Sequence, residues 1–192
     1  MLQLFILVPV AYLAGSINFP IILFRLTGRS DPRASFSGNP GTTNVYRQAG
    51  PAWAVLILLL DFGRAIGTAW MAGTLLSGAL VPWVGLALIL GNRYPCFHGF
   101  KGGKGVANFL GFFAMLAGLS TVFALLAWVI GFGLIRKPFI ASFFLVSVLG
   151  FLVVRTCENS PVAIAGTVTT VAFVIYNHRQ NVIELLQIEK TK

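Results

Sequence analysis

Apolar residues gather in runs that are long enough to cross a lipid bilayer, and these runs constrain the fold more than any other feature of the sequence. Hydrophobic residues make up 57% of the 192 residues and charged residues only 10%, against roughly 25% charged residues in an average soluble domain. A transmembrane helix needs about 20 mainly apolar residues. This balance excludes a disordered chain, a nucleic-acid-binding tail protein and an ordinary cytosolic enzyme.

Seven apolar segments predict an all-α integral membrane protein, a bundle of about seven transmembrane helices. They cover residues 2–24, 51–76, 79–91, 105–118, 119–135, 138–154 and 161–176. The fourth and fifth segments form one apolar stretch of about 30 residues, too long for a single crossing, so we expect a tight turn at Gly118–Ser120. Little of the chain is left for loops, and we therefore expect residues 1–192 to form a single transmembrane domain.

The basic residues predict how this bundle is oriented. Fourteen Lys and Arg residues against five Asp and Glu residues give a net charge of +9. Seven alternating spans put all but two of the cations on one side: Arg25, Arg29, Arg33, Arg47, Arg93, Lys101, Lys104, Arg136, Lys137, Arg179, Lys190 and Lys192. Arg155 falls on the other side, and Arg64 lies inside a span. Because cytoplasmic loops carry the excess of Lys and Arg, the basic side is expected to be cytoplasmic, with the N-terminus outside and the C-terminus inside.

The first basic loop is rich in small polar residues, which predicts an anion site. Glycine lets successive backbone N–H groups turn toward one anion, hydroxyls and amides donate hydrogen bonds, and the Arg47 guanidinium can hold a phosphate with two parallel bonds. The candidate binding residues are Ser35, Ser37, Gly38, Asn39, Gly41, Thr42, Thr43, Asn44 and Arg47. For this loop alone, a solvated loop with Asn and Gly turns explains the composition equally well.

The second basic loop contains FKGGKG, which resembles a phosphate-binding loop but does not fit a nucleoside-triphosphate site. Gly99 lies one residue too close to Gly103–Lys104, and Gly105 stands where a Ser or Thr would hold magnesium. Glycine amides at the start of a helix, together with a lysine, still make an anion cradle. The candidates here are Lys101, Gly102, Gly103, Lys104 and Gly105. The alternative is a basic loop that touches anionic lipid head groups, although lipid binding does not require the glycines.

Polar residues elsewhere add three smaller expectations. His178 and Asn181 are three residues apart and share a face if the tail is helical; a histidine that merely ends the last span is the alternative. Asp61 and Arg64 have the same spacing inside the second span, where an unpaired charge is costly, so we expect them to pair or to point into the bundle, either as a structural pair, which we favour, or as neighbours of a site. Ser142 lies in the first turns of the sixth span, where it could face a cytoplasmic cavity or pack two helices together.

Three stretches resemble the signatures of one enzyme family. SGNPGTTNVYR resembles S-G-N-x-G-x-T-N-x-x-R, GNRYPCFHGFKGGKGVA resembles G-H-x-x-P-x-F-x-x-F-K-G-G-K-G-V-A, and NHRQNVIELLQIE is similar to a weaker signature that begins H-R-x-N. These signatures belong to the acyl-phosphate glycerol-3-phosphate acyltransferases, the PlsY family. The chain departs from the family pattern at Asn92, where a histidine is common, at Arg64, where a lysine is common, and at Glu184, where a basic residue is usual.

The resemblance implies transfer of a fatty acyl group from acyl phosphate to the 1-hydroxyl of glycerol 3-phosphate, giving lysophosphatidic acid and phosphate, in phospholipid biosynthesis. It implies an enzyme of the bacterial inner membrane, surrounded by membrane lipids, with its active site on the cytoplasmic face. We expect a monomer that needs no metal or cofactor and binds no nucleic acid.

The resemblance also suggests which residues act. Catalytic roles are expected for Lys104 and His178, and substrate binding for the loop candidates together with Ser142, His178 and Asn181. Because an acyl phosphate has a good leaving group, we expect direct attack by the glycerol hydroxyl without an acyl-enzyme. Ser37 is the candidate nucleophile for the covalent alternative, but no activating base lies near it in the sequence.

Two other classes of protein share part of this pattern. A transporter or channel for an organic phosphate would have the same apolar bundle and basic loops, but transporters often show internal repeats, and no clear repeat relates the two halves of this sequence. A scaffold that binds anionic lipids needs cations but not the two glycine-rich signatures together. An acyltransferase requires all three signatures to meet at one pocket on the cytoplasmic side.

Overall fold

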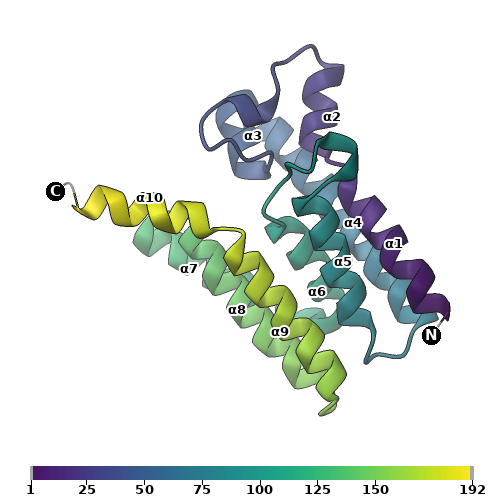
Figure 1. Ribbon diagram of the computed structural model, residues 1–192. Helices are drawn as coiled ribbons and strands as arrows, with labels where there is room; N and C mark the ends of the chain where they lie inside the picture. The colour runs from purple at the N-terminus through teal and green to yellow at the C-terminus, as the bar shows by residue number, and fades with distance from the viewer. Residues whose placement is uncertain (1, 191–192) are drawn as a thin grey trace.

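The computed structural model describes residues 2–190, and the side chains of residues 2–187. This part of the chain is all-helical (Figure 1). The α-helices are α1 (Leu2–Ser16), α2 (Phe19–Leu26), α3 (Thr42–Ala49), α4 (Pro51–Leu75), α5 (Val81–Arg93), α6 (Val106–Ala117), α7 (Thr121–Ile135), α8 (Pro138–Thr156), α9 (Pro161–Tyr176) and α10 (Arg179–Lys190). Short 3₁₀ turns are η1 (Pro32–Ala34), η2 (Cys96–His98) and η3 (Gly118–Ser120).

Prolines and polar caps set where several helices begin. α4, α8 and α9 each start at a proline, which lacks the N–H that a first helical turn leaves unpaired. Asn18 caps α2, where its Oδ1 accepts a hydrogen bond from the Ile21 N–H at 3.3 Å. The chain bends by 40° between α1 and α2. The first apolar segment is therefore a broken helix, not the unbroken span that the sequence predicts.

The helix lengths differ from seven equal spans. Among the described residues, α4, Val106–Ile135 and α8 are long and apolar enough to cross a membrane alone, and the count rises from 3 to 5 if the bent pairs α1–α2 and α9–α10 are each one span. α5 has 13 residues, about 20 Å of helix, against about 30 Å of hydrocarbon. The expected turn at Gly118–Ser120 is present as η3. The count of seven, and the side that each terminus faces, stay predictions.

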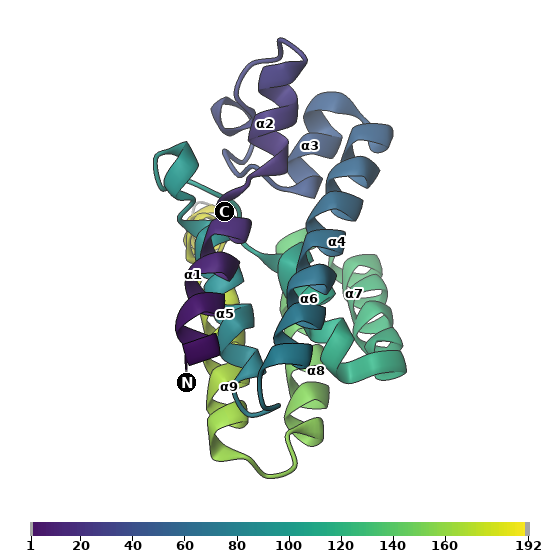
Figure 2. The ribbon, with the colours of Figure 1, turned by 90° about the vertical axis from the view of Figure 1, so that its right-hand side faces the viewer.

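The helices pack in pairs along the bundle. α1 lies against α5, α4 against α6, and α7 against α8, while α9 contacts both α5 and α8 (Figure 2). The centre holds the stacked rings of Phe109 and Phe113, whose centroids are 4.4 Å apart, with Phe112 beside them. This arrangement leaves α2, α3, α10 and the polar loops together at one end (Figure 1).

A glycine allows α1 and α5 to touch. A Cβ added at Gly15 would lie 2.0 Å from the Leu88 carbonyl oxygen, whereas a Cβ at Gly73 on α4 would meet nothing within 4 Å. We expect Gly15→Ala to destabilise the protein by about 1–3 kcal/mol, because the two backbones must separate. Gly73→Ala should be neutral, or stabilising by up to about 1 kcal/mol. Thermal unfolding in detergent measures both, and equal midpoints for the two variants would contradict this close contact.

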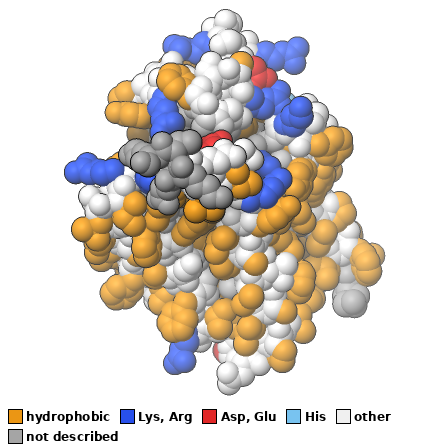
Figure 3. Space-filling view, turned by 60° about the vertical axis from the view of Figure 1, so that its left-hand side comes forward, with side chains coloured by type: hydrophobic (Ala, Val, Ile, Leu, Met, Phe, Trp, Pro, Cys, Tyr) orange, Lys and Arg blue, Asp and Glu red, His pale blue; other side chains and the backbone are white. Residues whose placement is uncertain are grey.

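Apolar side chains cover the outside of the bundle. Leu59, Phe123 and Leu134 are 62%, 64% and 79% exposed, and soluble monomers rarely show large continuous patches of this kind. Figure 3 shows an apolar belt around the middle, with Lys and Arg side chains gathered at the end that carries α2 and α3. We call this the basic end. α8 finishes at the opposite end, with Arg155 in its last turn.

Candidate active site

The first loop, residues 27–41, is shaped by side chains from α3. The Nδ2 of buried Asn44 donates to the carbonyls of Pro32 and Ser35 at 2.9 and 3.2 Å. Its Oδ1 accepts from the Ser37 N–H at 3.4 Å. Gln48 Nε2 donates to the same Pro32 carbonyl at 2.9 Å. Asn44, which the sequence predicts as a substrate ligand, is thus engaged in holding the loop.

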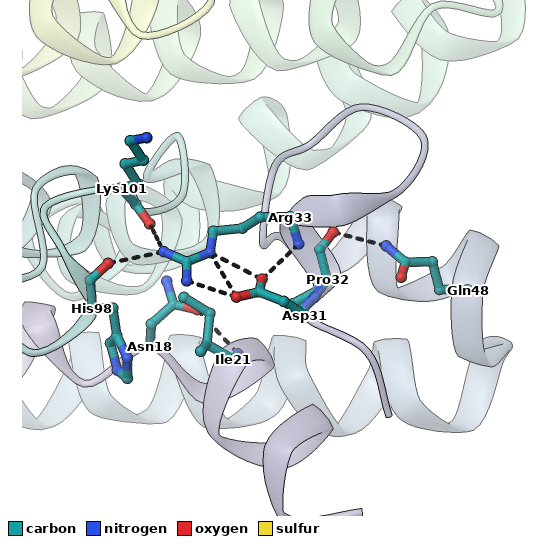
Figure 4. Close-up of polar contacts among 8 residues, drawn as sticks. All are labelled: Asn18, Ile21, Asp31, Pro32, Arg33, Gln48, His98 and Lys101. Carbon is teal, nitrogen blue, oxygen red and sulfur yellow. Dashed lines mark hydrogen bonds and ion pairs between the residues drawn. The ribbon is translucent and has the colours of Figure 1, made fainter. Parts of the chain in front are cut away.

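Arg33 ties the first loop to the second loop, residues 94–105 (Figure 4). Its Nη2 forms an ion pair with Asp31 at 2.6 Å. Its Nη1 donates to the carbonyls of His98 and Lys101 at 2.8 and 3.0 Å. A residue that the sequence analysis counts only for its charge therefore sets the spacing of the two signature loops.

The second loop uses its glycines for backbone contacts. The Gly102 N–H donates to the Arg93 carbonyl at 3.0 Å, and the Gly103 N–H donates to the Asn92 carbonyl at 2.9 Å. A Cβ at Gly102 would lie 2.0 Å from the Asn92 carbonyl oxygen, so only glycine lets the loop fold back on the end of α5. This differs from the expected anion cradle, because both amides are already bonded within the protein. The Lys104 side chain lines both cavities and can serve as an anion ligand in this segment.

Lys104 joins the second loop to the tail junction, residues 177–181. Its Nζ donates to Asn181 Oδ1, and its carbonyl accepts from Asn177 Nδ2 at 3.3 Å. Burial lowers the pKa of Lys104 to about 8; the Glu184 carboxylate opposes this shift and the Arg93 charge adds to it. Lys104 is therefore mostly a cation at neutral pH.

His178 lies at the bend between α9 and α10 and is 3% exposed. Its Nδ1 is 2.9 Å from the Val174 carbonyl oxygen. Since a carbonyl only accepts, Nδ1 carries the proton and Nε2 keeps its lone pair. Burial lowers the pKa of His178 to about 4; the Val174 hydrogen bond opposes this shift, and the charges of Lys104 and Arg93 add to it. The imidazole is thus neutral at physiological pH, and its Nε2 can accept a hydrogen bond.

Two adjoining cavities lie at the basic end. The main cavity, about 460 Å³, is lined by Ser37, Asn39, Pro40, Gly41, Thr42, Thr43, Asn44, Arg47, Leu58, Asp61, Asn92, Gly103, Lys104, Gly105, Val106, Ala107, Asn108, Leu110, Leu125, Trp128, Val129, Pro138, Phe139, Ser142, Leu145, His178 and Asn181. The polar cavity, about 260 Å³, is lined by Ser37, Gly38, Asn39, Arg93, Gly102, Lys104, Asn177, Arg179, Gln180, Asn181 and Glu184. The two loops, α3 and the tail junction supply most polar groups of the main cavity, and the membrane helices supply most of its apolar ones.

The structure brings most of the predicted site residues to these cavities. Ser35 and Lys101 are the exceptions: they line neither cavity, and Lys101 is exposed. Ser142 lines the main cavity, and its Oγ donates to the Pro138 carbonyl at 2.9 Å, which leaves its oxygen able to accept. The sequence motifs therefore predicted most of these cavity-lining residues. They could not show that, of the two lysines in KGGK, Lys104 lines the cavities and Lys101 does not.

Some lining residues were missed by the sequence analysis. Arg93 and Asn177 directly adjoin signature residues, so their position in the sequence was a usable signal. Trp128 on α7 lines the main cavity, but nothing in an apolar segment distinguishes a residue that faces a cavity from one that faces lipid.

Asp61 and Arg64 form the expected ion pair on α4, with 2.7 Å between Arg64 Nη2 and Asp61 Oδ1. Arg64 also donates to the carbonyls of Ala14 and Ile17 and to Asn108 Oδ1. Asp61 and Asn108 both line the main cavity. The pair thus connects the cavity wall to the break between α1 and α2.

Fold and site together define a helical membrane protein in which a cationic polar cavity adjoins a larger cavity with both polar and apolar walls. Residues 5–188 match the family model described as glycerol-3-phosphate acyltransferase. The chain belongs to this family, which confirms the resemblance seen in the three signatures.

Relatives match over nearly the whole chain. The chain is 38% identical over 184 residues to the glycerol-3-phosphate acyltransferase of Pseudomonas paraeruginosa, covering 95% of this chain and 96% of the relative. It is 38% identical over 196 residues to that of Anaeromyxobacter dehalogenans, covering 97% and 96%. Its fold is similar to a crystal structure of PlsY (YgiH), an integral membrane glycerol 3-phosphate acyltransferase, in the glycerol 3-phosphate form: the TM-score is 0.88 at 35% identity, over 96% of this chain and 92% of that one. The lysophosphatidic acid form gives a TM-score of 0.86 at 34% identity, with the same coverage.

Proposed function

We propose that this protein moves a fatty acyl group from acyl phosphate to the 1-hydroxyl of glycerol 3-phosphate, giving lysophosphatidic acid and inorganic phosphate. The observation that supports it most directly is the meeting of three separate signatures: Ser37, Lys104 and His178 all line the main cavity. The related PlsY structures are a glycerol 3-phosphate form and a lysophosphatidic acid form, which agrees with this reaction.

The main cavity has the two kinds of surface that the substrates need. Lys104, Arg47 and the donors of the first loop can hold phosphate groups. Leu125 and Trp128 on α7 supply an apolar wall that suits a fatty chain. The acyl carbonyl would then lie between the two regions, close to Lys104 and His178.

Direct transfer forms one bond and breaks one. The C1 hydroxyl oxygen attacks the acyl carbonyl carbon, the bond from that carbon to the phosphate oxygen breaks, and phosphate leaves with the electron pair. Lys104 stabilises the negative charge that develops on the carbonyl oxygen and on the leaving phosphate. Holding both substrates in one oriented arrangement can lower the barrier by about 7–11 kcal/mol, so no covalent intermediate is required.

His178 orients the attacking hydroxyl in this mechanism. Its neutral Nε2 accepts the hydroxyl hydrogen bond, while the Val174 carbonyl fixes the ring through Nδ1. With a pKa of about 4, the imidazole is a poor final proton acceptor. A substrate phosphate, whose second pKa is about 6, takes the proton instead.

An acyl-enzyme on Ser37 has less support. A serine nucleophile needs a base within hydrogen-bond reach, and no hydrogen bond joins the Ser37 hydroxyl to a base in the described part of the chain. Labelled acyl-protein trapped during turnover would favour the covalent route over direct transfer.

The basic end is proposed to face the cytoplasm of a bacterium, with the bundle in its inner membrane. The excess of Lys and Arg marks the cytoplasmic side of membrane proteins, and phosphorylated substrates are available there. We propose that residues 1–192 act as one domain and as a monomer, because residues of all three signatures of one chain meet at the main cavity.

The experiment that tests the function is a phosphate-release assay with purified protein in detergent or lipid mesophase, without added metal. Phosphate release from acyl phosphate that requires glycerol 3-phosphate, with formation of lysophosphatidic acid, is the expected result. Release without glycerol 3-phosphate would indicate a hydrolase. Uptake of organic phosphate into vesicles, without any release from acyl phosphate, would indicate a transporter.

The pH dependence of the reaction should report Lys104. Its pKa of about 8 means that the cation, and with it phosphate binding, is lost as pH rises above this value, so kcat/KM is expected to fall on the alkaline side. His178, with a pKa of about 4, stays neutral throughout this range. The arginine in Lys104→Arg keeps its charge to far higher pH, so kcat/KM of this variant should not fall on the alkaline side. An identical fall in the wild type and in Lys104→Arg would mean that another group causes it.

A further inference from the structure

Three cations and one carboxylate line the polar cavity: Arg93, Lys104, Arg179 and Glu184. While Lys104 is protonated, these groups leave two positive charges uncompensated. A phosphate monoester carries close to two negative charges at neutral pH. The cavity therefore matches such a ligand in charge, and its volume of about 260 Å³ leaves room for a phosphate group with bound water.

Arg93 is the least engaged of the three cations. Lys104 bonds to Asn181, and Arg179 donates to the Tyr176 carbonyl at 3.4 Å. In the described chain no side-chain hydrogen bond or ion pair of Arg93 is found, and its buried Nε lacks a partner. Its guanidinium lies over the Tyr94 ring at 5.5 Å. A free guanidinium at a cavity wall is the group best shaped to hold a phosphate by two parallel bonds.

Two buried amide oxygens indicate that the ligand of the polar cavity also carries hydrogen-bond donors. Asn39 Oδ1 and Asn177 Oδ1 are buried without a hydrogen-bond partner, and both residues line the polar cavity. An amide oxygen accepts hydrogen bonds and repels a phosphate oxygen, so these atoms suit hydroxyl groups. The wall thus combines cations for a phosphate with acceptors for hydroxyls.

The sequence of this chain differs from the family pattern inside this cavity. Glu184 stands where a basic residue is usual, and Arg93 falls at a position that the second signature leaves open. Both side chains line the same cavity.

We propose that Arg93 binds the phosphate group of a hydroxyl-bearing phosphomonoester in the polar cavity, and that Glu184 weakens this binding by offsetting one positive charge. The inference rests on the proposed function only for the identity of the ligand, which is then glycerol 3-phosphate.

Calorimetric titration of the detergent-purified protein with inorganic phosphate, and separately with glycerol 3-phosphate, tests the proposal without acyl phosphate. Arg93→Met should weaken binding of both ligands about 10- to 100-fold, the loss expected when hydrogen bonds to a charged group are removed. Glu184→Gln should tighten both. The double variant Arg93→Met/Glu184→Arg should regain most of the affinity, because it returns a cation to the cavity. Arg155→Met, at the opposite end of the bundle, is the matched control and should bind as the wild type does.

Unchanged phosphate affinity in Arg93→Met overturns the proposal. Weaker binding in Glu184→Gln as well overturns it, because both residues would then be structural. A loss for glycerol 3-phosphate but not for inorganic phosphate overturns the phosphate assignment. If Arg93→Met does not fold, Arg93→Lys replaces it in the test, because lysine keeps the charge but lacks the planar guanidinium. Arg93→Lys should bind phosphate with an affinity between those of the wild type and a variant without the charge. Wild-type affinity in Arg93→Lys would overturn the proposal that the guanidinium holds the phosphate by two parallel bonds. If the wild type binds phosphate through Arg93 yet transfers no acyl group, the proposed function is wrong while the Arg93 assignment stands.

Discussion

Lys104→Ala is expected to lower kcat/KM by about 100- to 1,000-fold in the phosphate-release assay, the usual loss when one donor to a developing oxyanion is removed. The reason is its position: Lys104 borders both cavities and contacts Asn181 of the tail junction. Alanine removes the charge that both the acyl carbonyl oxygen and the leaving phosphate would need. Gly102 and Gly103 cannot compensate, because their amides are bonded to the end of α5.

Lys101→Ala is the matched comparison for this prediction. Lys101 lies three residues earlier in the same loop, but its side chain is exposed and lines neither cavity. Its carbonyl, which accepts from Arg33 at 3.0 Å, is kept in the variant. We expect kcat/KM within a factor of about two of the wild type, since exposed charges contribute little. Equal losses in Lys101→Ala and Lys104→Ala would show that the loop acts through its overall charge, as a lipid-binding loop would.

Features that depend on local sequence were predictable. The apolar segments predicted the positions of the long helices. The turn at Gly118–Ser120 was predicted because the apolar stretch around it is too long for one crossing. The spacing of Asp61 and Arg64 predicted their ion pair. His178 and Asn181 do line one cavity, as predicted, but His178 lies at the bend before α10, so the two residues do not share a helical face.

Features that depend on contacts distant in the sequence were not predictable. The break after α1 is accompanied by hydrogen bonds from Arg64, some 50 residues later, to the carbonyls of Ala14 and Ile17. The hydrogen bonds from Arg33 to the carbonyls of His98 and Lys101 join residues that are 65 and 68 positions apart. Gly102, which was expected to bind an anion, instead permits close backbone approach to the end of α5. A pattern can indicate that glycine is needed at a position without indicating which neighbour requires it.

The ion pair of Asp61 and Arg64 lies inside the bundle, and Arg64 makes further hydrogen bonds to other parts of the chain. The two side chains are 9% and 8% exposed. Arg64 also reaches the carbonyls of Ala14 and Ile17 at the α1–α2 break, and Asn108 at the start of α6. One guanidinium therefore connects three parts of the chain in a region where an unpaired charge or carbonyl is costly.

We expect Asp61→Asn and Arg64→Met each to destabilise the protein by about 3–5 kcal/mol, because each leaves a buried charge without its partner. The double variant should lose clearly less than the sum of the two, since neither charge then remains. Arg64→Met should be the worse of the single variants, because it also removes the hydrogen bonds from the guanidinium to the carbonyls of Ala14 and Ile17 and to Asn108. Thermal unfolding in detergent measures all three.

Asp31→Asn provides the control, because it breaks an ion pair of the same chemistry at the surface. The Arg33 and Asp31 side chains are 26% and 40% exposed, and exposed pairs contribute about 0–1 kcal/mol. A loss for Asp31→Asn as large as that for Asp61→Asn would mean that burial does not decide the effect. Strictly additive losses in the Asp61 and Arg64 variants would mean that each side chain is stabilised by its other contacts, and that the network does not depend on the pair at its centre.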